Sequence, residues 1–256
     1  MNAAILNDMT KCIGCNACVL ACKEVNNLPK DAPSNVLSSK SWTAIEKKKG
    51  INIKRQCMHC NEPACVSACP VGALVKTETG AVTYDANKCM GCRYCLISCP
   101  FGIPAYEWDK PLPKVTKCIL CYENALKKGK QPACTSVCPT GATIFGDRDE
   151  LIQEAKNRIA KNPDKYVNHI YGLTEAGGTS VIYLSSIPFA ELGFPIDRQE
   201  ESYPKLTWKV LSQIPNIVST SSILLLGTWW IINRRIKLED SNDNIKNNDD
   251  ESIIHS

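Results

Sequence analysis

Short apolar runs separated by turns mark the strands that the sequence predicts in the first 147 residues. Residues 73–76 and 81–84 are two such runs, and the turn at residues 77–80 ends in glycine, so they predict a β-hairpin. Residues 3–6 and 142–146 are also mainly apolar, but neither run has a partner close to it in the sequence. We expect these two runs to pair with each other.

A helical pattern follows at residues 151–156, and both of its ends carry the usual signals. Two aspartates can cap its start, two basic residues lie near its end, and a proline stops it: Asp147, Asp149, Arg158, Lys161 and Pro163. Its apolar positions predict a surface helix, and residues 177–184 predict a buried strand. We expect residues 148–205 to form a helix and an extension that pack on the core.

Residues 210–233 contain no charged side chain. Crossing the hydrocarbon core of a membrane takes about 20 such residues, so we place a transmembrane helix at residues 206–236. Aromatic side chains suit both membrane interfaces: Tyr203, Trp208, Trp229 and Trp230. The polar Gln213, Asn216 and residues 219–222 favour packing on another membrane subunit over contact with lipid. A helix buried in a soluble protein is the alternative.

Sixteen cysteines fall into four groups of four, and three of the groups end in Cys-Pro. The groups are Cys12, Cys15, Cys18, Cys22; Cys57, Cys60, Cys65, Cys69; Cys89, Cys92, Cys95, Cys99; and Cys118, Cys121, Cys134, Cys138. The first and third groups have the spacing C-x2-C-x2-C-x3-C. In bacterial ferredoxins three thiolates of such a run bind one [4Fe–4S] cluster and the fourth binds its neighbour. Sixteen thiolates are enough for four such clusters.

Two other uses of cysteine explain the spacing less well. A disulfide framework is typical of short secreted chains, whereas this chain has 256 residues and starts with no apolar export segment. A structural zinc site uses two cysteine pairs, which leaves the third cysteine of each seven-residue run without a role. The pattern therefore favours iron–sulfur clusters.

Internal repetition indicates how the four groups pair. The motif D-x-x-K-C-x-G-C begins at Asp8 and again at Asp85, each time after a predicted strand. The second and fourth groups instead have a strand after their last cysteine. The hairpin joins groups two and three into one two-cluster unit, and groups one and four form a second unit around it. The competing scheme pairs neighbours, one with two and three with four.

The ferredoxin exchange of the fourth ligand, applied to the nested scheme, predicts four cages. They are Cys12, Cys15, Cys18 with Cys138; Cys118, Cys121, Cys134 with Cys22; Cys57, Cys60, Cys65 with Cys99; and Cys89, Cys92, Cys95 with Cys69. His59, inside the second group, is either a loop spacer or a hydrogen-bond donor that tunes a cluster.

The predicted fold class is α+β, with two nested bacterial-ferredoxin-like 2[4Fe–4S] units and one C-terminal transmembrane helix. Residues 1–147 form the four-cluster domain, with units at 1–22/118–147 and 57–117, and the Asn-, Asp- and Glu-rich tail 237–256 predicts disorder. Aromatic residues make up only 7%, so metal–thiolate bonds have to supply much of the folding free energy. The net charge of +4 is dispersed and gives no nucleic-acid footprint. The run of lysines at 47–49 predicts a solvated loop, with a docking patch as the alternative.

The nested cysteines and the single span resemble the membrane-anchored iron–sulfur subunits of hydrogenase-2 type and the beta subunit of respiratory formate dehydrogenase. The matching segments are residues 56–60, 89–95, 131–134, 177–179 and the final helix with Arg234 and Arg235. The resemblance implies nested cages, a catalytic partner with molybdopterin or nickel–iron, and a membrane partner that binds quinone or haem.

Three functions remain to be distinguished. The first is a non-catalytic subunit that relays electrons between a catalytic subunit and membrane quinone. The second is a soluble polyferredoxin that carries electrons to several enzymes, which the apolar span disfavours. The third is an enzyme that reduces a small substrate at a cluster, but such an enzyme needs an open iron position, and each group here offers four ligands.

Positive charge beside the span indicates its orientation in the cytoplasmic (inner) membrane. Arg234, Arg235 and Lys237 directly follow it, which favours a cytoplasmic C-terminus and a cluster domain on the periplasmic side. Basic residues before the span weaken this bias, and a cytoplasm-facing domain is the alternative. The first ten residues carry no twin-arginine signal, so we expect export with a signal-bearing partner or a signal missing from this sequence.

Overall fold

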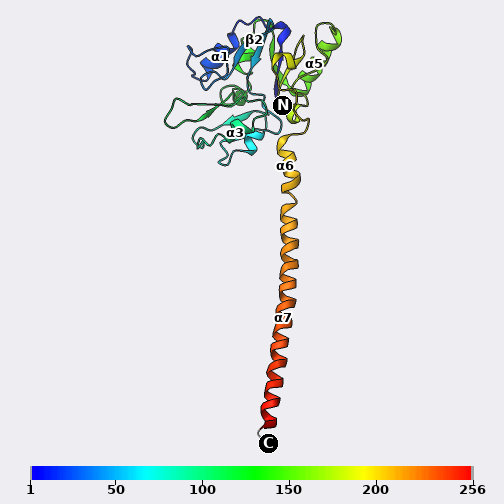
Figure 1. Cartoon of the computed structure of the whole chain (residues 1–256). Coiled ribbons are helices and arrows are strands. Elements are labelled where there is room, and N and C mark those ends of the chain that lie inside the picture. Colours follow the sequence, from blue (N-terminus) through cyan, green and yellow to red (C-terminus); the bar gives the residue numbers. More distant parts are fainter. Residues whose placement is uncertain (1, 255–256) are drawn as a thin grey trace. The chain divides into compact units, whose positions relative to one another are not determined.

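The computed structural model describes residues 2–254, with the backbone alone for 240–254 (Figure 1). The chain divides into two units, residues 1–205 and the segment from Leu206 onward. Nine strands lie in the described part: β1 Ala3–Asp8, β2 Ala44–Lys48, β3 Ile51–Arg55, β4 Leu74–Lys76, β5 Val82–Tyr84, β6 Ala105–Tyr106, β7 Val115–Thr116, β8 Thr143–Asp147 and β9 Val181–Leu184. Its α-helices are α1 Ala17–Val25, α2 Ala64–Ser67, α3 Tyr94–Ser98, α4 Ala133–Ser136, α5 Arg148–Lys161, α6 Tyr203–Leu211 and α7 Ile214–Ile254.

Strand β1 is the centre of a three-stranded sheet with the order β8-β1-β9. It pairs antiparallel with β8, where Ile5 lies opposite Phe145, which confirms the long-range pairing predicted from the sequence. It also pairs parallel with β9, where Leu6 lies opposite Ile182. The sequence predicts the β9 strand but not its partner. All residues of β1 and β9 are buried, because elements cover both faces of the sheet.

The two faces of this sheet form two separate hydrophobic cores, because successive side chains of a strand point to opposite faces. Ala4 and Leu6 pack with Ile182 and Leu184 beneath α5. Ile5 and the neighbouring strand positions face the core that contains the cysteine loops and an aromatic cluster: Tyr171, Tyr183, Phe189 and Phe194. One face of the sheet therefore supports α5, and the other supports the cysteine groups together with the aromatic residues of the extension.

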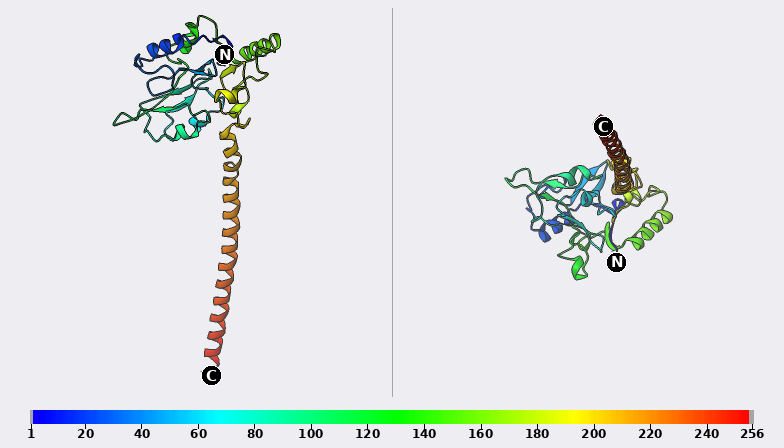
Figure 2. Two further views of the ribbon diagram at one scale, coloured as in Figure 1. Left: turned by 45° about the horizontal axis from the view of Figure 1, so that its top comes forward. Right: turned by 90° about the horizontal axis from the view of Figure 1, so that it is seen from below.

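Helix α5 has the boundaries that its sequence signals predict. Asp147 is its N-cap and accepts a hydrogen bond from the Asp149 amide at 3.1 Å. The helix buries Leu151, Ile152 and Ala155 against the sheet. In both views of Figure 2 the N-terminus of the chain lies beside this helix, as the pairing of β1 with β8 requires.

Three two-stranded ribbons surround the sheet, and the predicted β4–β5 hairpin is one of them. The β2–β3 hairpin corrects the expectation of a simple loop at residues 47–49. Lys47 and Lys48 lie on β2 and are exposed, whereas Lys49 and Gly50 form the turn, both with positive φ (49° and 79°). Two consecutive residues of positive φ suit the twist of a tight hairpin. The basic run is solvated as predicted, but the strands beside it are ordered.

The four short helices of the cysteine groups pack in two pairs. Helix α1 of the first group contacts α4 of the fourth, and α2 of the second group contacts α3 of the third. Each pair lies next to one strand pairing: β1 with β8 for the first and fourth groups, and β4 with β5 for the second and third.

The second unit contains the end of α6 and the long helix α7, which Figure 1 draws as one continuous rod. Residues Tyr203–Glu239 form a helical stretch that is long and apolar enough to cross a membrane, and none of its most apolar part is buried within the chain. The stretch breaks between α6 and α7, because Pro215 in the first turn of α7 has no N–H to donate to the preceding turn. The predicted span at residues 206–236 is therefore two helical segments.

The tail differs from its composition-based prediction. Helix α7 continues to Ile254, through residues for which the sequence predicts disorder, while residues 255–256 lie outside the described part. A helix satisfies its backbone hydrogen bonds internally, so a polar segment can extend an existing helix without packing on a core.

Candidate metal centres

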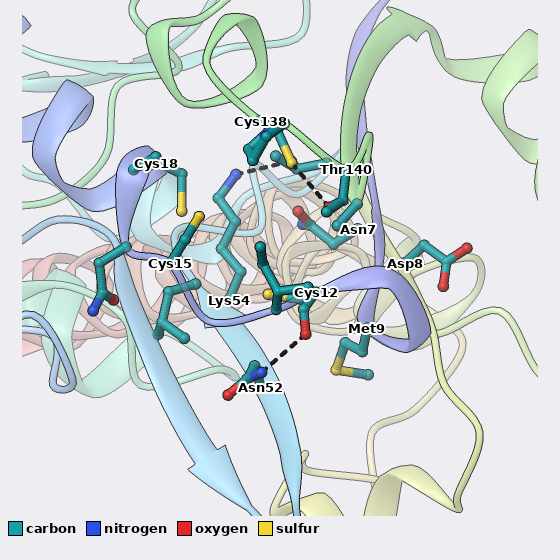
Figure 3. A pocket seen from close by; sticks show the side chains of 17 residues that line it. Asn7, Asp8, Met9, Cys12, Cys15, Cys18, Asn52, Lys54, Cys138 and Thr140 are labelled. Atoms are coloured by element: carbon teal, nitrogen blue, oxygen red, sulfur yellow. Dashed lines mark hydrogen bonds between the residues drawn. The ribbon is translucent and has the colours of Figure 1, made fainter.

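The first and fourth cysteine groups meet in a cavity at the end of β1. Cys12, Cys15 and Cys18 line it together with Cys138 (Figure 3). Cys12 follows the 3₁₀ turn Met9–Lys11, which continues directly from β1, and Cys138 precedes β8. The sheet pairing thus brings together cysteines that are more than a hundred residues apart in the sequence.

The backbone of the first cysteine loop depends on glycine. Gly14 has φ +74°, and a Cβ at this position would lie 2.8 Å from Oδ1 of Asn52. The Asn52 side-chain amide donates to the Cys12 carbonyl at 2.9 Å, so Asn52 fixes the position of this loop. Gly91 has the same φ in the third group. Two positions after each glycine, Asn16 in the first loop and Arg93 in the third loop also have a left-handed backbone. The sequence repeat is therefore also a repeat of backbone conformation.

The remaining cysteines gather in three more sets. One cavity is lined by Cys22, Cys118, Cys121 and Cys134. Another is lined by Cys69, Cys89, Cys92 and Cys95. The last four thiols are Cys57, Cys60, Cys65 and Cys99, and they also lie near one another. The pKa of Cys60 is raised first by burial and then by the charges of the other three cysteines, which are therefore close to it.

Several of these thiols do not ionise readily on their own. All sixteen cysteines are free. Burial raises the pKa of Cys18 to about 11 and that of Cys22 and Cys65 to about 12, so the lone thiolates are disfavoured at neutral pH. A bound metal reverses this, because a coordinating thiol loses its proton outright.

The arrangement fits an iron–sulfur cluster better than a single ion. In the part of the chain that the structure describes, no group of three or more His, Cys, Asp or Glu side chains could hold one metal ion. A four-iron cluster places each thiolate on a different iron and so needs a wider cage. The buried Asn7 amide lines the first cavity and has no hydrogen-bond partner among the described residues, so it can donate into the space between the cysteines.

Comparisons with known proteins agree with this chemistry. Two families described as 4Fe-4S dicluster domains match residues 49–148 and residues 11–73. The hydrogenase-2 operon protein HybA of Escherichia coli O157:H7 is 39% identical over 75% of this chain and 72% of its own length. The iron–sulfur subunit of nitrate-inducible formate dehydrogenase from Escherichia coli K12 is 36% identical over 80% and 76%. A Nitratidesulfovibrio vulgaris relative named only "Protein" is 40% identical over 91% and 68%.

The chain belongs to this family of ferredoxin-type iron–sulfur electron-transfer subunits. Its cofactors are [4Fe–4S] clusters. The resemblance seen in the cysteine spacing is confirmed.

His59 of this iron–sulfur subunit has a defined protonation state. It is fully buried, and its Nδ1 accepts from the Val82 amide at 2.9 Å, so the ring proton lies on Nε2. Burial, and then the charges of Lys117 and Lys76, lower the pKa of His59 well below its ordinary value. Its Nε2 has no partner among the described residues. The neutral ring therefore carries an Nε2–H that no described residue accepts, and a role in tuning a cluster stays a prediction.

Three lysines are buried in the described part of the chain, and two of them, Lys54 and Lys117, lie close to cysteine groups. Lys54 on β3 is 4% exposed and lines the first cavity, and Lys117 before the fourth group is 2% exposed. Lysine usually remains in solvent, so its residue type gives no signal for burial. For Lys54 the only sequence signal is the Lys49-Gly50 turn, which identifies the hairpin that carries it.

Replacing Gly14 by alanine should weaken the first cysteine loop more than the same change at Gly72. Both glycines have positive φ, which costs an alanine about 1–2 kcal/mol, but only at Gly14 does the new Cβ collide with a neighbour. Displacing Asn52 also loses a hydrogen bond worth about 1 kcal/mol. The rate of iron loss to a chelator, measured anaerobically, should rise more in Gly14→Ala than in Gly72→Ala. Equal rates in the two variants would contradict the role given to Asn52.

Proposed function

We propose that this chain is a non-catalytic subunit that relays electrons through four [4Fe–4S] clusters. One partner is a catalytic subunit of formate dehydrogenase or hydrogenase type, with molybdopterin or nickel–iron. The other is an integral membrane partner of cytochrome b type that binds quinone or haem. The observation that carries the proposal is the gathering of sixteen free cysteines into four sets of four.

The cages in this proposal are nested. Cys12, Cys15 and Cys18 bind one cluster with Cys138, and Cys118, Cys121 and Cys134 bind the next with Cys22. Cys57, Cys60 and Cys65 bind a third with Cys99, and Cys89, Cys92 and Cys95 bind a fourth with Cys69. The pairing of β1 with β8 and of α1 with α4 supports the outer unit. The β4–β5 hairpin and the contact of α2 with α3 support the inner one.

Each proposed cage has three cysteines from one group and one from the group paired with it. The C-x3-C ending of each group therefore links two cages. Cys18 and Cys22, for example, lie on α1 about one helical turn (~5.4 Å) apart, and they line different cavities. The cluster, when bound, takes up and gives back single electrons. The chain holds each cluster close to its neighbour and keeps water away from it, so that electrons pass between clusters and do not escape to solvent.

The exchange of ligands can be tested by matching the signals that cysteine variants lose. The wild-type chain, reconstituted anaerobically, should bind about sixteen irons, four in each cluster. Cys22→Ser should damage the same electron paramagnetic resonance (EPR) signal as Cys118→Ser, and Cys138→Ser the same signal as Cys12→Ser. Cys22→Ser matching Cys12→Ser instead would contradict the exchange. If it matched Cys60→Ser, neighbouring groups would be paired and the nested scheme would be wrong.

The apolar helical stretch supports membrane attachment over a soluble polyferredoxin. Its side chains are exposed in the chain itself, and exposed apolar surface of this extent marks a site that contacts a membrane or another protein. The polar positions Gln213 and Asn216 on the same stretch suit a helix–helix contact within the membrane.

Deleting residues 206–256 should release a soluble cluster domain. This variant should still accept electrons from the catalytic partner but should no longer reduce quinone, because the contact with the membrane subunit is lost. Deleting only residues 240–256 is the matched control, since it leaves the apolar stretch and its basic end in place. Quinone reduction at the wild-type rate by the larger deletion would exclude a membrane relay.

We place the cluster domain on the periplasmic side of the cytoplasmic membrane. Arg234, Arg235 and Lys237 end the apolar stretch, and such charges favour the cytoplasmic side. The clusters are assembled in the reducing cytoplasm, so a domain on the outside has to cross the membrane folded.

Protease added to spheroplasts should therefore degrade the cluster domain and spare an epitope attached after Ser256. The reason is that only the part outside the membrane meets the enzyme. Antibodies to both parts give the readout, and a cytoplasmic marker protein should stay intact. A protected cluster domain with a cleaved epitope would reverse the orientation.

A further inference from the structure

Lys54 is a buried cation inside the first cysteine cavity. Figure 3 shows its amine reaching into the cavity that Cys15, Cys18 and Cys138 also line. Its Nζ donates to the Thr143 hydroxyl at 3.0 Å, which satisfies one of the three protons of an ammonium. Within the described part of the chain no carboxylate lies within ion-pair distance of it.

A buried ammonium needs a negative partner, because burial removes the water that stabilises its charge. Lys54 lies close enough to Cys134 and Cys18 to interact with both of them. Those two cysteines belong to the first and second cages of the proposed function. Four thiolates outweigh the positive charge of a four-iron core, so a loaded cage is the negative group that Lys54 lacks.

Lys117 occupies a comparable place in the other proposed unit. Its Nζ donates to the carbonyl of Val82 and, at 3.0 Å, to that of Cys118. Val82 packs in one core with Cys65 and Cys95, which belong to the third and fourth cages. Lys117 also lies close enough to Cys65 for its charge to act on that thiol. No ion pair of Lys117 occurs among the residues described.

Each lysine lies just before one cysteine group in the sequence, but its amine lies with other groups. Lys54 precedes the second cysteine group in the sequence, yet it lies with the first and fourth groups. Lys117 precedes the fourth group, yet its amine lies against the hairpin of the second and third. Lys23 is also buried, but it donates to the carbonyls of Lys30 and Ala32 and lines neither of the two cavities that flank α1.

We propose that Lys54 and Lys117 are fixed counter-charges, one in each two-cluster unit, that raise the reduction potential of the clusters beside them. The inference rests on the four-cluster function proposed above. Reduction adds a negative charge to a cluster, and a nearby positive charge stabilises that reduced form most where the surroundings exclude water. Both lysines are positioning residues, since they act on the clusters and bind no iron.

Potentiometric titration followed by EPR tests this on the reconstituted full chain. The signals of each unit are first assigned with the cysteine variants. Lys54→Met should lower the midpoint potential of a signal from the outer unit by at least about 59 mV. This is a tenfold change in the reduction equilibrium of a one-electron couple. The inner unit should not shift. Lys117→Met should give the reverse pattern.

Three further variants separate charge from packing. Lys54→Arg and Lys117→Arg keep the charge and should restore most of the potential. Lys47→Met removes an equal charge from the exposed strand of the same hairpin and should leave every potential unchanged.

An unchanged potential in Lys54→Met with all iron bound would overturn the proposal. So would an equal shift in Lys47→Met, or loss of a cluster in both Lys54→Met and Lys54→Arg, which would indicate packing alone. A wild-type chain that binds fewer than about sixteen irons would refute the four-cluster function. The effect of the lysines would still be measured on the clusters that are present.

Discussion

The pairing of β1 with β8 is the constraint on which the cysteine geometry depends. Asn7 lies opposite Thr143, and the Asp8 amide donates to the Ala142 carbonyl at 2.7 Å, so the end of one strand meets the start of the other. Cys12 and Cys138 lie just beyond these positions and are therefore brought into one cavity. Closing so long a loop costs little more than closing a short one, since each doubling of length adds only about 0.6 kcal/mol. A complete unit can thus be inserted between the two halves of another.

The extension after β8 joins the two halves of the cluster domain. Strand β9 completes the sheet beside β1, and the residues leading into it bond to the second cysteine loop. The Ser180 and Val181 amides donate to the carbonyls of His59 and Met58, both at 3.1 Å. The Tyr183 hydroxyl donates to the Lys54 carbonyl at 2.9 Å, which fixes the strand that carries the buried lysine. The extension therefore helps to set the cages, although it contains no cysteine.

The sequence predicts the features that depend on local spacing. The cysteine repeat, the β4–β5 hairpin and the Asp147 cap follow from residues close to each element, and the β1–β8 pairing follows because neither run has a local partner. The parallel pairing of β9 does not, because parallel strands need a long crossover and leave no local signal. The sequence also does not predict the burial of Lys54 and Lys117, because a lysine is expected to be exposed to solvent unless its partner is known. That partner is a cofactor, which no residue pattern places next to a lysine.

Folding of this domain is therefore coupled to cluster loading. Half of the sixteen cysteines are buried, and buried thiols without metal contribute only as small apolar side chains. The two buried lysines would lack a counter-charge without the clusters, and the Asn7 amide would lack a partner. Each of these groups costs free energy in an empty domain and stabilises a loaded one, so they add to the folding free energy that metal–thiolate bonds supply. The same residues that hold the clusters thus make the empty fold unfavourable, and iron insertion has to accompany folding.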